Sequence, residues 1–102
     1  MITFEFVQKD MLERLGLQEQ PHFEKTSFRN NKKIFLTYNA AEDLICVKLK
    51  PEDQQSFELV AKGVIFAVPN KWGQQGWTLA RLNQLEKDLY DDLIQTALAQ
   101  FK

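Results

Sequence analysis

Apolar and polar side chains alternate through the run DLICVKLK at residues 43–50, and this run constrains the fold more than any other part of the chain. A β-strand would send the two kinds of side chain to opposite faces. The apolar set is Ile45, Val47 and Leu49, and the polar set is Cys46, Lys48 and Lys50. Pro51 follows at once and is typical of the first turn of a helix. We therefore expect a strand with one core face and two neighbouring lysines on its outer face, leading directly into a helix.

The same periodicity predicts the other elements. Helices are expected over residues 3–16, 51–63 and 83–101, and strands over residues 22–28, 32–39, 43–50, 64–68 and 77–82. Thr3 is the expected cap of the first helix, Asn83 and Glu86 have capping-box spacing before the last, and Phe57, Val60 and Ala61 are the inward residues of the second. The order α-β-β-β-α-β-β-α predicts an α+β fold, a two-layer sandwich with a five-stranded antiparallel sheet.

Length and composition indicate one domain spanning residues 1–102. An apolar share of 44% is enough for a core without a disulfide or a metal. The single cysteine, Cys46, favours a reducing cytoplasm, and no stretch resembles a signal peptide or approaches a membrane span. We therefore expect a cytoplasmic protein that does not contact membranes.

Charge is unevenly distributed although the net charge is only −1. Residues 25–50 contain six basic and two acidic side chains, whereas residues 1–24 contain two basic and five acidic ones. A nearly neutral protein can therefore present one positive face. A sequence pI of about 5.8 argues against a protein that is basic as a whole.

Catalytic chemistry is not expected. The only histidine, His22, has no evident orienting partner, and Cys46 has no evident activating group. One histidine and one cysteine cannot complete a zinc site, and the adjacent acidic pairs along the chain point apart on a regular element. Gly73 and Gly76 precede no GK[ST] motif. We predict no enzyme activity, no cofactor, no metal site and no small-molecule substrate.

Two expected hairpin tips, RNNKK and NKWGQQG, carry donors suited to phosphates and base edges. With the outer face of the sheet between them they give the predicted nucleic-acid-binding set: Arg29, Lys32, Lys33, Lys48, Lys50, Lys71, Trp72 and Arg81. A merely solvated face is the alternative interpretation, and lysines at strand ends also discourage edge aggregation; it covers Lys25, Lys32, Lys33, Lys48 and Lys50. Trp77 is expected in the core, whereas Trp72 could either pack against the sheet edge or stay exposed.

The stretches KIFLTYNAAEDLICVKLKPED and VPNKWGQQGWTLARL, followed by an amphipathic helix, resemble the MmcQ/YjbR family of small bacterial proteins. The resemblance covers nearly the whole chain. It implies an antiparallel sheet with helices in the order derived above, and a double-wing arrangement for binding DNA, assigned to the family by comparison of folds. No catalytic residues come with it.

Two functions from different classes follow from these observations. The first is a DNA- or other nucleic-acid-binding module that uses two hairpin wings and a basic sheet face. The second is a protein-interaction or homodimerising domain, because the family sheet is similar to that of the secretion chaperones; Phe35 or Trp72 would then lie exposed among lysines. If Lys33, Lys48, Lys50 and Arg81 share one outer face, nucleic acid is favoured; if they scatter, a protein partner is favoured.

Overall fold

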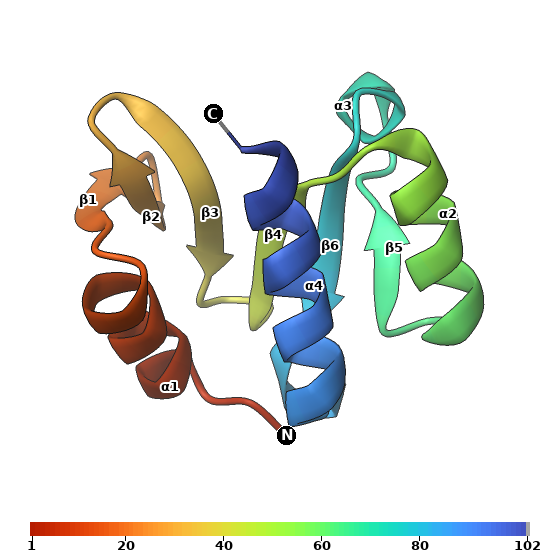
Figure 1. The fold of residues 1–102 in the computed structure, drawn as a ribbon, viewed down its shortest axis with the longest axis horizontal. Coiled ribbons are helices and arrows are strands. Elements are labelled where there is room, and N and C mark those ends of the chain that lie inside the picture. Colours follow the sequence, from red (N-terminus) through yellow and green to blue (C-terminus); the bar gives the residue numbers. More distant parts are fainter. Residues whose placement is uncertain (102) are drawn as a thin grey trace.

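The computed structural model, which describes residues 1–101, is an α+β fold built on one antiparallel sheet (Figure 1). The sheet has six strands in the order β1-β2-β3-β4-β6-β5. The strands are β1 (Gln18–His22), β2 (Lys25–Asn30), β3 (Lys33–Asn39), β4 (Leu44–Lys48), β5 (Ile65–Ala67) and β6 (Trp77–Arg81). The predicted fold class is confirmed in its coarse form, but the predicted number of five strands is wrong.

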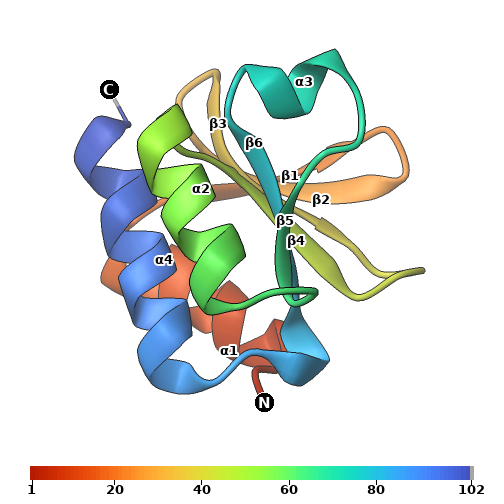
Figure 2. The same cartoon turned by 90° about the vertical axis from the view of Figure 1, so that its right-hand side faces the viewer.

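Helices cover one side of this sheet. They are α1 (Phe4–Lys9), which continues as a π-helical segment (Asp10–Arg14), α2 (Pro51–Val60) and α4 (Lys87–Gln100). The short α3 (Lys71–Gln74) lies apart from them, at the end of the sheet where β6 begins, and a 3₁₀ turn (Leu82–Gln84) connects β6 to α4. Figure 2 shows α1, α2 and α4 together on one side, so the opposite side of the sheet has no covering layer of helices.

The strand missed in the sequence is β1, whose five residues QEQPH contain no apolar side chain other than that of Pro21. No hydrophobic alternation marks such a segment, and the expected strand over residues 22–28 is in fact interrupted by a turn at Phe23 and Glu24. The turn pairs His22 with Lys25 and starts the β1–β2 hairpin. The first hairpin of the protein therefore lies one strand earlier than expected.

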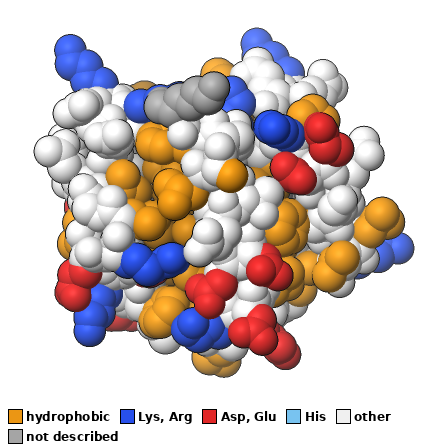
Figure 3. Space-filling model, viewed as in Figure 1, with side chains coloured by type: hydrophobic (Ala, Val, Ile, Leu, Met, Phe, Trp, Pro, Cys, Tyr) orange, Lys and Arg blue, Asp and Glu red, His pale blue; other side chains and the backbone are white. Residues whose placement is uncertain are grey.

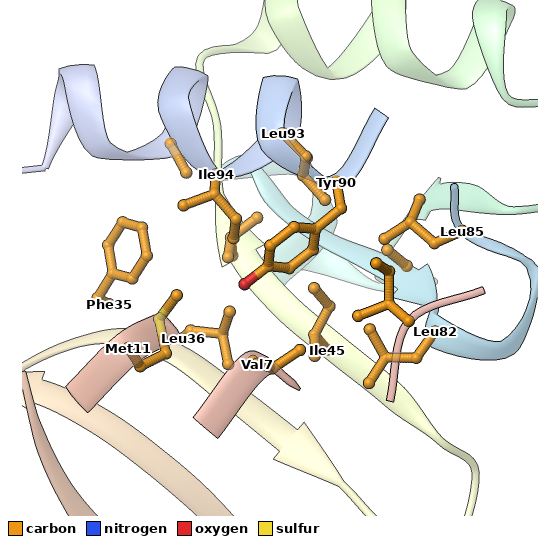
Figure 4. Close-up of a cluster of buried hydrophobic side chains, with 14 of the residues drawn as sticks. Val7, Met11, Phe35, Leu36, Ile45, Leu82, Leu85, Tyr90, Leu93 and Ile94 are labelled. Carbon is orange, nitrogen blue, oxygen red and sulfur yellow. The ribbon is translucent and has the colours of Figure 1, made fainter. Parts of the chain in front are cut away.

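The core lies between the sheet and the three long helices (Figure 4). Ile45, Val47 and Leu49 are buried, as predicted from their alternation. Val7 and Met11 of the first helix and Tyr90, Leu93 and Ile94 of α4 contribute the facing side chains. Thr3 caps α1 by accepting a hydrogen bond from the backbone N–H of Phe6, which confirms that expectation.

A β-bulge between Phe28 and Arg29 changes which residues of β3 reach the core. Phe28 pairs with Leu36 but Arg29 pairs with Ile34, so Phe35 is the additional residue on β3. Phe35 and Leu36 are consequently both buried, and the ring of Phe35 contacts that of Phe101 edge-on at 5.1 Å. The expectation that Phe35 could be exposed to a partner is therefore wrong.

Two expectations about helix ends are also wrong. Asn83 belongs to the 3₁₀ turn, and Glu86 is itself the N-cap residue of α4, with no side-chain capping bond. Val60 is 76% exposed because α2 ends there, and Ala61 alone turns fully inward. Periodicity located the bodies of these two helices but did not fix where α4 begins or how α2 ends.

A buried tyrosine connects α4 to the first helical segment. The Tyr90 hydroxyl donates to Asp10 Oδ2 at 2.8 Å, and Arg14 Nη2 donates to the same oxygen at 2.9 Å. Burial alone would raise the pKa of Asp10, but the hydrogen bonds from Arg14 and Tyr90 outweigh it and hold the pKa below its ordinary value of 3.8. Burial and the Asp10 carboxylate raise the pKa of Tyr90.

The edge strand β5 lies beside α2 (Figure 1). The backbone N–H of Ile65 donates to the carbonyl of Ala61 at 3.0 Å, and that of Ala67 donates to Glu58 Oε2 at 3.3 Å. Two donors of this strand are thus bonded to α2 and the residue after it, while the strand pairs with β6 on its other side.

Candidate nucleic-acid interface

Basic and acidic residues are segregated between the strands and the helices. The six strands contain five basic residues and one acidic residue. By contrast, α1 with its π-helical extension, α2 and α4 together contain three basic and nine acidic residues. Figure 3 shows the helical side, with acidic side chains gathered over the beginning of α4. The protein is therefore polarised, although its net charge is only −1.

The side of the sheet away from the helices is named here the open face. Strand register places Thr37, Cys46 and Leu79 in one row across β3, β4 and β6, and Lys48 beside Trp77 in another. Thr37, Cys46, Trp77 and Leu79 are partly exposed, and Lys48 is exposed. The open face thus combines apolar atoms with cationic side chains.

A groove of about 470 Å³ runs over the open face. It is lined by His22, Phe23, Lys25, Ile34, Thr37, Cys46, Val68, Asn70, Trp72 and Trp77. Phe23 and Trp72 are its most exposed apolar side chains, at 93% and 51% exposure. They come from two separate elements, the β1–β2 turn and α3, so the fold brings together two aromatic residues that lie far apart in the sequence.

The stretch VPNKWGQQGW folds into a capped helical turn rather than an open loop. Asn70 caps α3 by accepting a hydrogen bond from the backbone N–H of Trp72 at 2.8 Å. A Cβ on Gly73 would come within 2.0 Å of the Val68 carbonyl oxygen, and one on Gly76 within 2.0 Å of the Leu49 carbonyl oxygen. Both glycines are therefore required by close backbone packing.

Gln54 of α2 connects this turn to the helical layer. Its side chain is buried, and its Nε2 lies 3.1 Å from the carbonyl of Gly73, 3.2 Å from that of Trp77 and 2.9 Å from Thr78 Oγ1. Thr78 Oγ1 in turn donates to the carbonyl of Gly76 at 2.8 Å. This buried network holds α3 in place while the Trp72 side chain remains exposed.

Three of the predicted lysines meet at one end of the sheet. Lys32, Lys33 and Lys48 line a hollow of about 390 Å³ together with Trp77 and Phe101. Lys33 Nζ lies 5.1 Å from the centre of the Phe101 ring, and Lys48 Nζ lies 5.8 Å from that of Trp77. This lysine hollow shares Ile34 and Trp77 with the open-face groove, so the two adjoin.

The remaining predicted cations do not join this cluster. The Arg29 guanidinium donates to Ser27 Oγ at 2.8 Å and lies 3.3 Å from His22 Nδ1, so it is bonded to its own hairpin. Lys50 is the N-cap residue of α2 and lines a hollow with α4. Arg81 stacks over Phe66 at 4.9 Å and donates to the Gly63 carbonyl.

Lys71 is exposed on α3 beside Trp72. The predicted set is therefore divided among several surfaces. The expectation that Lys48 and Lys50 lie side by side on the sheet is wrong, because the strand ends at Lys48.

Trp77 was predicted to lie in the core, and this prediction is wrong. Trp77 is partly exposed on the open face, because the alternate residue Thr78 faces α2 and bonds to Gln54. Sequence reasoning also missed Phe23 and Lys25, which lie at the unrecognised β1–β2 turn. The only available signal in the sequence was Phe23 itself, an apolar residue that does not fit a regular alternation in the expected strand over residues 22–28.

The groove contains the one cysteine and the one histidine of the chain. Burial raises the pKa of the Cys46 thiol to about 11, although nearby Lys25 partly opposes this. A protonated thiol is the opposite of what nucleophilic catalysis needs. Within residues 1–101 no three His, Cys, Asp or Glu side chains come together as a metal site.

Comparison with known proteins adds the fold alone. The chain is similar to the crystal structure of a Pseudomonas syringae protein solved as a structural genomics target, with a TM-score of 0.70 and 19% identity. The match covers 95% of this chain and 96% of that one. No protein-family model and no curated protein matches the sequence. Across the described residues, no helix is both long and apolar enough to cross a membrane.

Proposed function

We propose that this protein binds nucleic acid through the open face and the adjoining lysine hollow. The observation that carries the proposal is the segregation of charge, with five basic residues against one acidic residue on the strands. Basic side chains on such a surface would contact the phosphates of a nucleic acid. Binding through phosphates is largely electrostatic and does not depend on the base sequence. The resemblance to the MmcQ/YjbR family and its double-wing arrangement for DNA points in the same direction, with the β2–β3 turn and α3 as the wings.

The contacts fit this function without a catalytic role for any residue. Lys33 and Lys48 lie over aromatic rings, which hold their ammonium groups at the surface of the hollow. Lys25 extends the same charge along the groove. Acidic residues are concentrated on the helical side, so a polyanion would be attracted by one face and repelled by the other.

Fluorescence anisotropy of labelled single-stranded and duplex oligonucleotides, from about 20 to 200 mM salt, tests the proposal. If about four cations displace counterions, the plot of log K against log salt should have a slope of about −3 for the single strand and about −3.6 for the duplex. A Lys33→Glu/Lys48→Glu variant should lose at least tenfold in affinity. A Lys50→Glu/Lys62→Glu variant makes the same change in net charge away from the open face and should bind nearly as well as the wild type.

Two results would contradict the proposal. One is unchanged anisotropy at the lowest salt concentration. The other is equal loss of binding in both double variants, which would mean that net charge matters and the open face does not.

A protein partner is the second candidate, and two observations favour it. Lys50 and Arg81 lie away from the hollow that Lys33 and Lys48 share, and scatter of these four cations is the arrangement expected for a protein partner. Leu59 and Val60 are 83% and 76% exposed at the end of α2. Adjacent exposed aliphatic side chains suit a second copy of the chain or another protein. Sedimentation velocity at increasing concentration tests self-association. A dimer that dissociates in a Leu59→Ser/Val60→Ser variant would support it, and a monomer at all concentrations would exclude a homodimer.

A further inference from the structure

In the β1–β2 turn, Phe23 occupies a position whose backbone conformation is unfavourable for a phenylalanine. Phe23 has a φ of 58°, in the left-handed region where glycine and asparagine are the usual residues and a bulky residue is strained. Phe23 is 93% exposed, and its ring meets that of neighbouring His22 edge-on at 4.8 Å. The ring therefore does little for the core. Backbone strain at an exposed side chain is a reason to look for function.

Trp72 also exposes an aromatic ring, but on a backbone that hydrogen bonds hold in place. Its ring is half exposed, whereas the backbone of its helical turn is fixed by the Asn70 cap and by buried Gln54. The position of the ring is thus set before any ligand arrives, which reduces the entropy lost on binding. Both rings line the same groove.

The groove between these rings combines flat apolar surface with positive charge. Its volume of about 470 Å³ lies within the ~300–1,000 Å³ that is usual for sites binding small organic groups. Ile34, Val68 and Trp77 provide apolar walls. Lys25 also lines the groove, and its charge reaches Cys46, where it acts to lower the pKa of the thiol. Lys48 lies beside Trp77 at one end. A ligand that matches this lining has planar rings joined by an anionic chain.

We propose that the groove binds unpaired bases of a single-stranded nucleic acid, which stack on Phe23 and Trp72 while Lys25 and Lys48 contact the flanking phosphates. This inference rests on the proposed function and narrows it to single strands. Bases in a duplex are stacked on one another and cannot present a free face to these rings, whereas unpaired bases can. Stacking of this kind tolerates any base, so little sequence preference is expected.

The test compares three labelled probes of equal length: a single-stranded oligonucleotide, the same strand with abasic sites in its central part, and its duplex. The single strand should bind at least tenfold more tightly than the abasic strand or the duplex. Trp72→Ala should weaken binding of the single strand about tenfold and leave the abasic strand almost unaffected. Phe23→Asn should weaken the single strand similarly while retaining the fold, because asparagine tolerates the left-handed backbone. Leu59→Ala, an exposed apolar residue outside the groove, is the matched control.

The outcomes separate this inference from the function on which it rests. If duplex and single strand bind equally, or if Phe23→Asn and Trp72→Ala bind the single strand like the wild type, the base-stacking site is refuted. Nucleic-acid binding would still stand in that case, provided that Lys33→Glu/Lys48→Glu loses affinity. If none of the probes binds to the wild type, both proposals fail. Quenching of tryptophan emission that disappears in Trp72→Phe would place the bases on α3.

Discussion

The β1–β2 turn and the β2–β3 turn have the same length and begin with the same backbone φ, but the residue that adopts this φ is very different in the two. Each has two residues between paired strands, and the first residue adopts a φ of 58° at Phe23 and 59° at Asn31. Asparagine tolerates this conformation because its short polar side chain adapts to it, whereas phenylalanine does not. Local backbone energetics therefore explain Asn31 and leave Phe23 unexplained. The difference shows how a residue placed for folding can be told from one that needs another reason.

A third turn, between α3 and β6, also contains a residue with positive φ. A substitution there should cause the largest loss of unfolding free energy. Gly76 has a φ of 105° and its α-carbon faces the Leu49 carbonyl. Gly76→Ala combines backbone strain with a steric clash and should cost ~3 kcal/mol of unfolding free energy in urea denaturation. Gly63→Ala is the control, because its φ is 82° with open space around it, and it should cost only ~1 kcal/mol. Equal costs would show that the close approach to Leu49 is unimportant.

Placing a phenylalanine in the second turn should reproduce the strain of the first. We expect Asn31→Phe to lower the unfolding free energy by ~1–2 kcal/mol, the usual cost of a bulky residue in this conformation. In a domain of this size such a loss lowers the melting temperature by roughly 4–8 °C per kcal/mol. An unchanged melting temperature would mean that the turn relaxes to another conformation, and the comparison with Phe23 would lose its basis.

The reverse change should stabilise the protein. Phe23→Asn relieves the strained residue and should raise the unfolding free energy by ~0.5–1 kcal/mol, measured by thermal denaturation. The double swap, Phe23→Asn with Asn31→Phe, should come close to the sum of the two single changes. A loss of stability in Phe23→Asn would indicate that the ring packs in solution and would remove the structural reason for assigning it to a ligand.

Lowering the pH should have the smallest effect of all on the difference in unfolding free energy between the variants of the two turns. The pKa of Asp10 is lowered in the fold, so its contribution is complete above the ordinary value of 3.8 and is lost as the pH falls below it. Total stability should therefore decline in that range, and less steeply in Asp10→Asn. The difference between Phe23→Asn and Asn31→Phe should stay constant, because neither change adds or removes a titrating group. A difference that varied with pH would connect one turn to the Asp10 network.

Sequence periodicity predicted the parts of the fold that it physically determines. The strand around Ile45 and the stripe on α4 bury apolar residues, and burial imposes the periods that were recognised. The polar strand β1 was missed because it contributes no core residue. The lysine at position 50 was misplaced because β4 ends at Lys48 and Lys50 is already the N-cap residue of α2, which begins at Pro51.

The candidate site was harder to predict than the fold. Lys32, Lys33 and Lys48 were found from their charge, and the structure brings them to one hollow. The open position of Trp77 depends on a polar contact, that of Thr78 with Gln54, which outweighs the preference of tryptophan for the interior. Phe23 enters the groove only because a turn interrupts the expected strand. Long-range hydrogen bonds and turn geometry leave no periodic trace in the sequence.

The hydrogen bonds from Ile65 and Ala67 to Ala61 and Glu58 have a consequence for the behaviour of this protein at high concentration. A strand from another molecule that approached β5 would find these two donors already occupied, with α2 in the way. Sheets in neighbouring molecules therefore cannot merge through this edge into longer ribbons, which is a common route to fibrils. Replacement of Glu58 by alanine would free one of these donors and should make the protein more prone to aggregate on prolonged storage.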